Sequence, residues 1–371
     1  MKINTLEHLE DKPDHDPTAA DRKRDHIELA LKSQVTQLDS RFSYEPLFSA
    51  HPASGSLKPF EFLGKTVKTP MWVSSMTGGT ALARTINRNL ATAAAEFGFG
   101  MGLGSCRQLL YSDATFEDFN VRPILGDDVP FFANLGIAQL ELLIDRKETF
   151  LIPKMLDKLQ ADGLIVHINP MQEWLQPEGD RFKRSPLATI ETLLELMDKP
   201  LIVKEVGQGF GKESLKILFQ LPLAAVDFAA AGGTSFSMLE LLRGSDFRKN
   251  QFGALASIGH SAVEMVDFTR EIIEELGDKR RCNQVIVSGG IQDFFRWVLL
   301  HQKIANSCCL WASLRIFEAR TRRLCDFTDF CRSANSRFGT RRSVFESTLR
   351  KYIKSKNPFK PVRLNGFLLL Y

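Results

Sequence analysis

Between about residues 70 and 291, short apolar runs alternate with longer segments whose apolar residues recur at helical spacing. Seven of the short runs are apolar at nearly every position, which is typical of parallel strands covered on both faces. They are Met71–Ser75, Gly98–Gly104, Pro130–Gly136, Gly163–Asn169, Pro200–Val206, Leu223–Ala229 and Gln284–Ser288. The helical patterns between them span Ala83–Phe97, Ile137–Ile144, Pro186–Met197, Glu213–Gln220 and Ala262–Leu276. This order predicts an α/β fold, and a (β/α)8 TIM barrel is its nearest common form.

Nearly every predicted strand ends in a polar or glycine-containing cluster. The clusters are Met76–Gly79, Gly104–Arg107, Asn134–Gly136, His167–Glu173, Lys204–Gly209, Gly232–Ser235 and Ser288–Gly290. In a closed barrel the carboxyl ends of all strands meet at one face, where ligands bind. An open doubly wound sheet, which is the alternative, would use only the loops around one switch point. The clusters therefore favour the closed barrel.

The character of the sequence changes after about residue 294. Neither an apolar strand nor a glycine turn of the expected kind follows, and helical periodicity is poor. Residues 295–371 carry 16 Lys and Arg against four Asp and Glu, although the whole chain has a net charge of only +4. Seven repeats are thus recognisable, and we expect the eighth to be missing or degraded. We divide the chain into an N-terminal arm (residues 1–60), a barrel (61–294) and a basic tail rich in Cys, Phe and Arg (295–371).

Composition and motif spacing argue against several classes of protein. Hydrophobic residues make up 44% of the chain and charged residues 25%, as in ordinary globular proteins. The first 20 residues lack the apolar core of a signal peptide, and no run approaches the roughly 18 apolar residues that cross a bilayer. No cysteine pair has C-x2-C spacing, and the arginines of the tail lack the spacing of a nucleic-acid module. We expect a cytoplasmic protein with no membrane or nucleic-acid partner.

Two glycine-rich turns, Gly232–Ser235 and Ser288–Gly290, follow the sixth and seventh strands. Glycines allow close approach of the backbone, and N–H groups at a helix start can bind phosphate oxygens. The last strands of such barrels often carry a phosphate site. The pair of turns therefore predicts a phosphate site, with ordinary tight turns as the alternative.

Lys204 ends the fifth strand, where a buried charge is costly without a partner. A cation at this position would stabilise an anionic ligand, such as a reduced flavin ring. A buried ion pair with Glu205 or another carboxylate is the alternative.

The fourth strand is followed by an imidazole, two amides and a carboxylate within seven residues. His167 and Asn169 suit hydrogen bonding to a substrate, and Gln172 suits orientation or proton relay. Glu173 suits a Mg²⁺ that bridges to phosphate oxygens. Alternatively, Asn169 is a helix N-cap with Pro170 at the first helical position, which explains neither Gln172 nor Glu173.

Basic residues occur at two further places that could meet an anion. Arg22, Lys23 and His26 lie in the arm, and Arg107 follows the second strand. Arginine pairs with phosphate through two parallel hydrogen bonds. Together these cations suit a diphosphate, although the cluster in the arm would also fit a solvated helix start.

The order of these motifs resembles that of the type 2 isopentenyl-diphosphate isomerases, from about Arg22 to Asp293. The shared motifs are R-K-x-D-H-I, S-M-T-G-G, G-S-x-R, N-L-G, H-x-N-x-x-Q-E, K-E-V-G, G-G-T-S and S-G-G-I. The combination of H-x-N-x-x-Q-E with K-E-V-G is the most specific part. The resemblance implies FMN and Mg²⁺ as cofactors, NADPH as the reductant, and a homo-oligomer (tetramer or octamer). It also implies interconversion of isopentenyl and dimethylallyl diphosphate in isoprenoid biosynthesis, with no net redox change.

The resemblance also implies a role for each site residue. FMN would be held by Ser75, Met76, Thr77, Ser105, Asn134, Lys204 and Thr234, with Ser288, Gly289 and Gly290 near its phosphate. The substrate would contact Arg22, Lys23, His26, Arg107, His167, Asn169 and Gln172, and Glu173 would ligate Mg²⁺. The catalytic residues would be Gln172, His167 and Lys204, in an allylic proton shift carried by the reduced flavin.

The chain departs from the family pattern in three places. Cys106 stands where Gln is usual, and the polar residue before the glycine turn is replaced within Asp227–Ala231. The eighth strand and its glycine turn have no counterpart after Phe294, and we hypothesise a reading-frame change near that codon. Two alternatives stay open: a catalytically impaired or dead family member, and another FMN-dependent barrel oxidoreductase. The H-G-x-R-Q motif of hydroxyacid oxidases is missing around His260.

Overall fold

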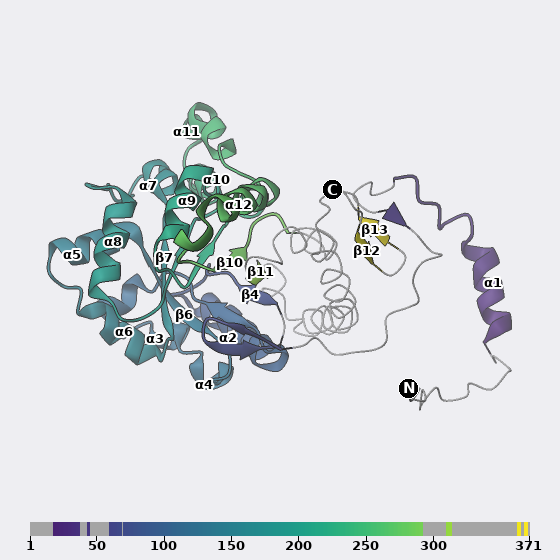
Figure 1. Cartoon of the computed structure of the whole chain (residues 1–371), viewed down its shortest axis with the longest axis horizontal. Helices are drawn as coiled ribbons and strands as arrows, with labels where there is room; N and C mark the ends of the chain where they lie inside the picture. The colour runs from purple at the N-terminus through teal and green to yellow at the C-terminus, as the bar shows by residue number, and fades with distance from the viewer. Residues whose placement is uncertain are drawn as a thin grey trace. The chain divides into compact units, whose positions relative to one another are not determined.

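The computed structural model describes residues 18–37, 43–44, 59–68, 70–291, 309–313, 362–364 and 367–369. Backbone contacts divide the chain into two compact units. One consists of Met1–Pro52 with Val344–Tyr371, and the other of Ala53–Ser343. The larger unit contains a closed barrel of parallel strands with helices around it (Figure 1).

Eight strands close the barrel in the order β10-β11-β4-β5-β6-β7-β8-β9. Their bounds are β4 (Met71–Val73), β5 (Gly100–Gly102), β6 (Phe131–Gly136), β7 (Gly163–His167), β8 (Leu201–Lys204), β9 (Ala225–Asp227), β10 (Gln284–Val287) and β11 (Cys309–Ser313). Each of the seven apolar runs contains one of the first seven strands. The prediction of an α/β TIM barrel is confirmed.

The eighth position of the barrel is occupied by β11, so of the two expectations for the eighth repeat, missing or degraded, a missing strand is excluded. β11 pairs in parallel with β10 along four residues, from Gln284↔Cys309 onward, and with β4 through Ala312↔Met71. The backbone of a short extended segment is enough to cover both strand edges, which would otherwise be open for pairing with other chains. The rest of the predicted tail lies almost wholly outside the described residues. The reading-frame change stays a hypothesis.

Among the described residues of the larger unit, six helices of nine or more residues pack around the barrel. They are α2 (Ala81–Phe97), α5 (Ile137–Asp145), α6 (Leu151–Leu159), α8 (Pro186–Leu196), α9 (Lys212–Gln220) and α12 (Ala262–Leu276). All were predicted except α6. Their ends have clear causes: the Thr80 hydroxyl accepts the Ala83 N–H at 3.1 Å at the start of α2, and Gly98 ends it at a φ of +65°.

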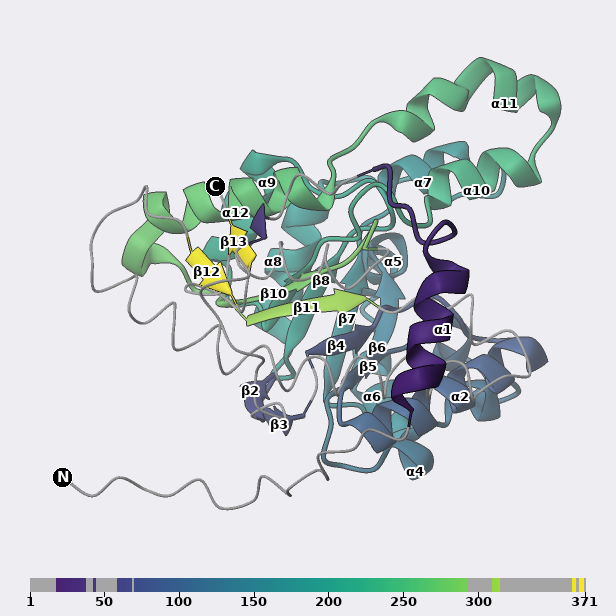
Figure 2. The same ribbon diagram turned by 90° about the vertical axis from the view of Figure 1, so that its right-hand side faces the viewer.

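Shorter elements form the loops between these helices. They are α3 (Phe116–Phe119), α4 (Arg122–Leu125), α7 (Pro170–Leu175), α10 (Phe236–Arg243), α11 (Asp246–Phe252), η1 (Arg107–Leu110), η2 (Gly253–Ser257) and η3 (Gly277–Lys279). In Figure 2, α11 lies at the end of an excursion that leads away from the barrel.

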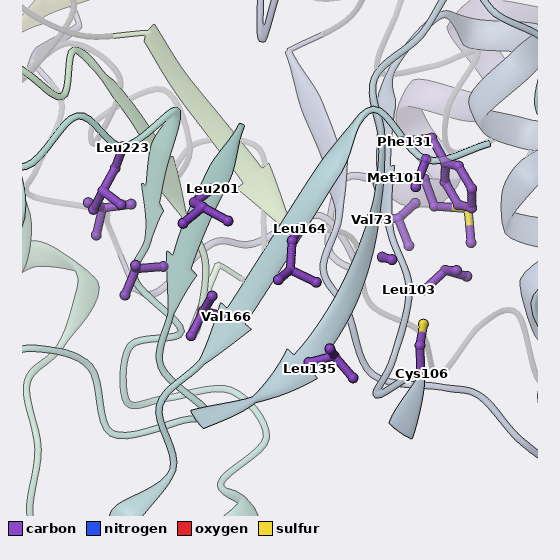
Figure 3. Close-up of a cluster of buried hydrophobic side chains, with 14 of the residues drawn as sticks. Val73, Met101, Leu103, Cys106, Phe131, Leu135, Leu164, Val166, Leu201 and Leu223 are labelled. Carbon is purple, nitrogen blue, oxygen red and sulfur yellow. The ribbon is translucent and has the colours of Figure 1, made fainter. Parts of the chain in front are cut away.

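The outward side chains of the strands pack under the helices in the larger of two apolar clusters. Figure 3 shows part of this cluster, with Val73, Met101, Leu135 and Val166 among its members. Each of these four side chains is at most 1% exposed. Burial of this strand face, together with burial inside the barrel, explains why the runs are apolar throughout.

The inward side chains near the middle of the barrel form the second apolar cluster, which we call the lower layer. Its strand residues are Trp72, Phe132, Ile165, Ile202, Ala225 and Ile286. The Trp72 ring packs edge to face against Phe62 and Phe132, with centroids 5.9 and 6.1 Å apart. A Cβ at Gly100 or Gly163 would lie 2.4 Å from one of these rings, so glycine at both positions makes room for them.

A hairpin closes the N-terminal end of the barrel. It consists of β2 (Phe60–Phe62) and β3 (Lys65–Val67). Phe62 and Val67 are fully buried and belong to the same cluster as the lower layer. The Leu63 N–H donates to Oε1 of Gln284, the first residue of β10, at 3.1 Å. This apolar closure leaves the opposite face, at the carboxyl ends of the strands, for a ligand.

The described residues of the smaller unit form one helix and a sheet. The helix is α1 (Ala19–Leu29), and the sheet has the order β1 (Ser43–Tyr44), β13 (Phe367–Leu369) and β12 (Val362–Leu364), with antiparallel pairing. No residue of α1 is buried. None of the helices in the described parts of either unit has the length and apolar character that a bilayer crossing requires.

Candidate active site

Directly beyond the lower layer, most strands carry a polar residue, and we call this set the polar layer. It consists of Ser74, Asn134, His167, Lys204, Asp227 and Ser288. Each follows a lower-layer residue by two positions, and strand side chains on one face recur every two residues. The pairing register places His167 beside Lys204 and Lys204 beside Asp227. The alternation along each strand therefore brings these groups together inside the barrel.

Lys204 is the cation of the polar layer. The residue is 5% exposed, and its ammonium donates to the Glu205 backbone carbonyl at 2.8 Å. An ammonium has three donors, and within the described part of the chain this is its only hydrogen bond. The two remaining donors are suited to an acceptor on a ligand.

The ion pair between Lys204 and Glu205 that was considered as an alternative is not found among the described residues. Oε2 of Glu205 instead accepts the backbone N–H groups of Gly207, Gln208 and Gly209 at 2.7, 2.6 and 2.8 Å. Burial raises the pKa of Glu205, and these three N–H groups and the Lys204 ammonium oppose that rise. Glu205 thus shapes the loop after β8, and the Lys204 ammonium remains available inside the barrel.

His167 is held as a neutral imidazole. Its Nδ1 lies 2.7 Å from Oδ1 of Asn134, so Nδ1 carries the proton and Nε2 is the acceptor. Burial and the Lys204 ammonium lower the pKa of His167 to about 4. A Cβ at residue 136 would lie 2.8 Å from Nε2, which explains the glycine there. His167 can therefore accept a hydrogen bond without adding charge beside Lys204.

Asn169 precedes α7 but does not cap it with its side chain. The helix begins at Pro170, as the alternative reading predicted, yet the Asn169 amide donates to Gln172 Oε1 at 3.2 Å and to Glu173 Oε1 at 2.9 Å. Oδ1 of Asn169 is buried and has no hydrogen-bond partner among the described residues. A buried acceptor without a donor is costly, so this oxygen marks a place for a ligand.

Glu173 is held by two donors, one on each carboxylate oxygen. Asn169 binds Oε1, and the Asp180 N–H donates to Oε2 at 2.7 Å. Arg107 lies at the same loop, with its guanidinium 3.2 Å from the Asp180 carboxylate. The structure thus brings Arg107 together with the segment that follows β7.

Glu240 is a buried acid of this site that the sequence analysis missed. It is 3% exposed on α10, and its Oε1 accepts from Gln172 Nε2 at 3.3 Å. Glu240 also pairs with Arg243, which in turn contacts Glu178 at 2.8 Å. The sequence signal that could have revealed Glu240 is its place on the same face of α10 as Ser237 and Leu241, which are also buried.

The two glycine turns pack backbone against backbone. A Cβ at Gly232 would lie 3.2 Å from Cα of Gly290, and one at Gly233 would lie 3.2 Å from Cα of Gly289. Gly232, Gly289 and Gly290 have φ angles of +102°, +90° and +69°, which favour glycine. Thr234 follows in the exposed part of the first turn, next to Ser235, which is the N-cap of α10. The turns form one glycine-walled surface next to a helix start, as a phosphate site requires.

The loop after β4 holds three of the predicted cofactor residues, and they differ in their contacts. Ser75 Oγ is buried without a partner in the described residues, and a Cβ at Gly102 would lie 2.3 Å from it. The Thr77 hydroxyl donates to Asn87 at 2.6 Å, and its carbonyl accepts the Gly104 N–H at 3.0 Å. Met76 is partly exposed. Ser75 Oγ can therefore still form a hydrogen bond, whereas Thr77 links the loop after β4 to the loop after β5.

The loop after β5 contains Ser105, which is exposed, and Cys106, which is fully buried. The Cys106 N–H donates to the Asn134 carbonyl at 2.7 Å, and burial raises the pKa of its thiol to about 12. The thiol is thus a packing group below the site.

Three predicted substrate contacts lie in the other unit. Arg22, Lys23 and His26 are exposed on α1, and their part in the site stays a prediction. His260, the histidine considered above as an oxidase base, packs its ring edge to face against Phe268 with centroids 5.4 Å apart. Its carbonyl accepts the Ala231 N–H at 2.9 Å.

Known proteins resemble this chain in sequence and in fold. The curated isopentenyl-diphosphate delta-isomerases of Rickettsia prowazekii (strain Madrid E) and Rickettsia typhi (strain ATCC VR-144 / Wilmington) are 35% identical over 279 and 278 residues. Each alignment covers 73% of this chain and 78% of the relative. No family model matches.

Among solved structures, the recombinant flavin-binding domain of baker's yeast flavocytochrome b2 is similar, with a TM-score of 0.52 and 16% identity over 80% of this chain and 71% of that one. A mandelate oxidase mutant with a monooxide FMN adduct has a TM-score of 0.50 and 11% identity, covering 80% of this chain and 81% of that one. At these identities the similarity concerns the barrel fold alone.

Proposed function

Because the chain belongs to the isopentenyl-diphosphate delta-isomerase family and is an isomerase, we propose that it interconverts isopentenyl and dimethylallyl diphosphate with reduced FMN in the barrel mouth. The observation that carries the proposal is the polar layer: Lys204 and His167 lie in register beside each other, next to loops with unsatisfied buried oxygens. Such groups are costly in an apolar barrel unless a ligand binds them.

The described residues fit FMN in two respects. Ser75 Oγ lacks a partner and Lys204 has spare donors, as expected where a flavin ring presents polar edges. The glycine turns pack closely against each other beside the start of α10, where backbone N–H groups can bind its phosphate. In this proposal Ser75, Met76, Thr77, Ser105, Asn134, Lys204 and Thr234 hold the cofactor, with Ser288, Gly289 and Gly290 near the phosphate. When bound and reduced, FMN would supply the proton carrier for the allylic shift.

The substrate diphosphate would meet the cations at the rim. The family resemblance implies that Arg107 contacts the diphosphate, together with Arg22, Lys23 and His26 of the arm. Glu173 would ligate Mg²⁺, which commonly binds through one or two carboxylates and substrate phosphates.

Gln172 would orient the reacting carbon chain. Its amide is fixed at both ends, by Asn169 at 3.2 Å and by Glu240 at 3.3 Å. An amide is neither a strong acid nor a strong base, so the Glu240 carboxylate is the titratable end of this pair. His167 would contribute a neutral hydrogen bond, and Lys204 would stabilise negative charge on the cofactor.

The family resemblance supports the remaining parts of the proposal. They are NADPH as the reductant, a role in isoprenoid biosynthesis and a homo-oligomer (tetramer or octamer). A cytoplasmic location is proposed from the sequence alone, by elimination.

A visible spectrum of the purified protein, followed by an anaerobic assay, tests the function. We expect a yellow protein, or one that becomes yellow with added FMN, that converts isopentenyl diphosphate only after reduction. A protein that stays colourless with FMN and shows no turnover would favour the dead family member. Turnover of a 2-hydroxy acid with net flavin reduction would favour the oxidoreductase.

A further inference from the structure

Asp227 ends β9 and is fully buried in the polar layer, but none of the proposed contacts to FMN or substrate uses it. Its carboxylate accepts hydrogen bonds from the hydroxyls of Ser288 and Ser74, the latter at 3.4 Å. A buried carboxylate is expensive, so its retention at this depth needs a reason.

The two serines belong to strands that are not neighbours. Ser74 follows β4 and Ser288 follows β10, and β11 lies between these strands in the barrel. Asp227 therefore connects two strand ends across the position of β11. The connection runs through side chains inside the barrel. It adds to the backbone pairing of the strands in the barrel wall.

Asp227 also determines where the second glycine turn lies. Ser288 Oγ, which donates to Asp227, accepts the Ala229 N–H at 2.7 Å, and the Ser288 carbonyl accepts the Ala230 N–H at 2.9 Å. Gly289 leaves no room for a Cβ, which would lie 2.0 Å from the Ala230 carbonyl oxygen. The segment after β9 and the turn after β10 are thus locked together, with Asp227 beneath them.

Two titratable groups follow Asp227 in the pairing register. The charged Lys204 is its partner on β8, and the neutral His167 is the partner of Lys204 on β7. Burial raises the pKa of Asp227, whereas the Lys204 ammonium, the two serine hydroxyls and the Ala229 N–H act against that rise. The Glu205 carboxylate is already bound by three N–H groups. Asp227 is therefore the carboxylate of the polar layer that can balance Lys204.

We propose that Asp227 is a positioning residue of the cofactor site: it holds the Ser288–Gly290 turn in place and balances the charge of Lys204. It would thereby set both the affinity for FMN and the stability of the reduced, anionic flavin. This inference rests on the proposed binding of FMN.

The variant Asp227→Asn tests the charge, because asparagine has nearly the same shape. The variant should bind FMN about tenfold more weakly than the wild type, because the buried serine hydroxyls lose a charged acceptor. The midpoint potential of the bound FMN, measured by anaerobic titration against reference dyes, should shift to more positive values, since a nearby negative charge is gone. Asp227→Glu should return the potential toward that of the wild type.

The variant Ser288→Ala separates position from charge and covers the case in which Asp227→Asn does not fold. It should weaken FMN binding by about threefold to tenfold, as loss of one hydrogen bond predicts, and leave the potential unchanged. Ser74→Ala, whose contact is longer, should change the affinity less than Ser288→Ala.

The possible failures are distinguishable. A wild-type protein that binds no FMN contradicts the proposed function and this inference together. If Asp227→Asn and the wild-type holoprotein have the same midpoint potential and the same affinity for FMN, only the inference is contradicted. Unchanged affinity in Ser288→Ala would refute the positioning of the turn.

Discussion

The interior of the barrel has two layers of opposite character, although the same strands carry both. The lower layer is apolar and sealed by the hairpin that contributes Phe62, and the polar layer two residues further along contains Lys204, Asp227 and His167. A shift of two residues along a strand is about 7 Å, so stabilising and functional side chains are close neighbours. We therefore expect substitutions in the lower layer to change stability and those in the polar layer to change ligand binding and chemistry.

The largest effect should come from Phe132→Ala in the lower layer. Removing a fully buried ring beside Trp72 leaves a cavity and should lower the free energy of unfolding by about 3–5 kcal/mol. Denaturant titration measures this change. Phe150→Ala is the matched control, because Phe150 is 63% exposed and should change stability by less than about 0.5 kcal/mol. Equal losses in the two variants would contradict the assignment of the lower layer.

A pH effect on stability should come from His167, whose pKa is lowered from 6.5 to about 4 in the folded protein. Between these values the unfolded chain binds a proton that the folded protein does not. The free energy of unfolding should therefore fall as the pH drops through this window, by about 3 kcal/mol in total, and be unaffected by this group above pH 6.5.

Denaturant titrations from pH 7 to pH 4 measure this effect against the variant His167→Gln, which should lack that share of the loss. His260→Gln is the control and should retain it. A wild type and a His167→Gln variant that lose stability in parallel would rule out a neutral His167 in the folded state.

Lys204→Met should reduce turnover by about 100-fold and weaken FMN binding, since a preorganised cation is removed from the site. An assay with reduced enzyme and the visible spectrum measure the two effects. Lys199→Met is the control, because Lys199 is exposed before the start of β8 and should behave as the wild type. Full activity in Lys204→Met would contradict the assignment of the polar layer to the cofactor.

Glu240→Gln should have the smallest effect of the four, about a tenfold fall in kcat with little change in KM, as loss of a proton-transfer partner predicts. Steady-state kinetics with isopentenyl diphosphate measure both constants. Glu213→Gln, at an exposed position in the first turn of α9, should change neither. A rise in KM alone would mean that Glu240 contributes to binding and not to the chemistry.

Much of the fold could be predicted from periodicity. The seven apolar runs and five amphipathic segments correspond to strands and helices because burial on both strand faces and on one helix face leaves a direct trace in the residue order. β11 left no such trace. In the sequence, no clear helical periodicity precedes Cys309–Ser313, and the position of this strand depends on the edges of β10 and β4.

The candidate site could be predicted only in part, and the limit lies in contacts between loops. His167 to Glu173 and Lys204 could be placed at the strand ends because polar residues directly follow apolar strands. Glu240 was missed because its meaning depends on Gln172, 68 residues earlier in the chain. The pairing of Lys204 with Glu205 looked plausible in sequence, but the backbone N–H groups of the following loop bind that carboxylate instead.

The residue order by itself determined which side chains share a strand face, since alternation at a period of two is a local property of an extended chain. It likewise determined the glycine turns, because only glycine adopts their backbone angles readily. Tertiary structure alone decided which strand closes the barrel and which groups meet across it, as Asp227 meets Ser74 and Ser288. These contacts depend on curvature and closure of the whole sheet, which no short segment encodes.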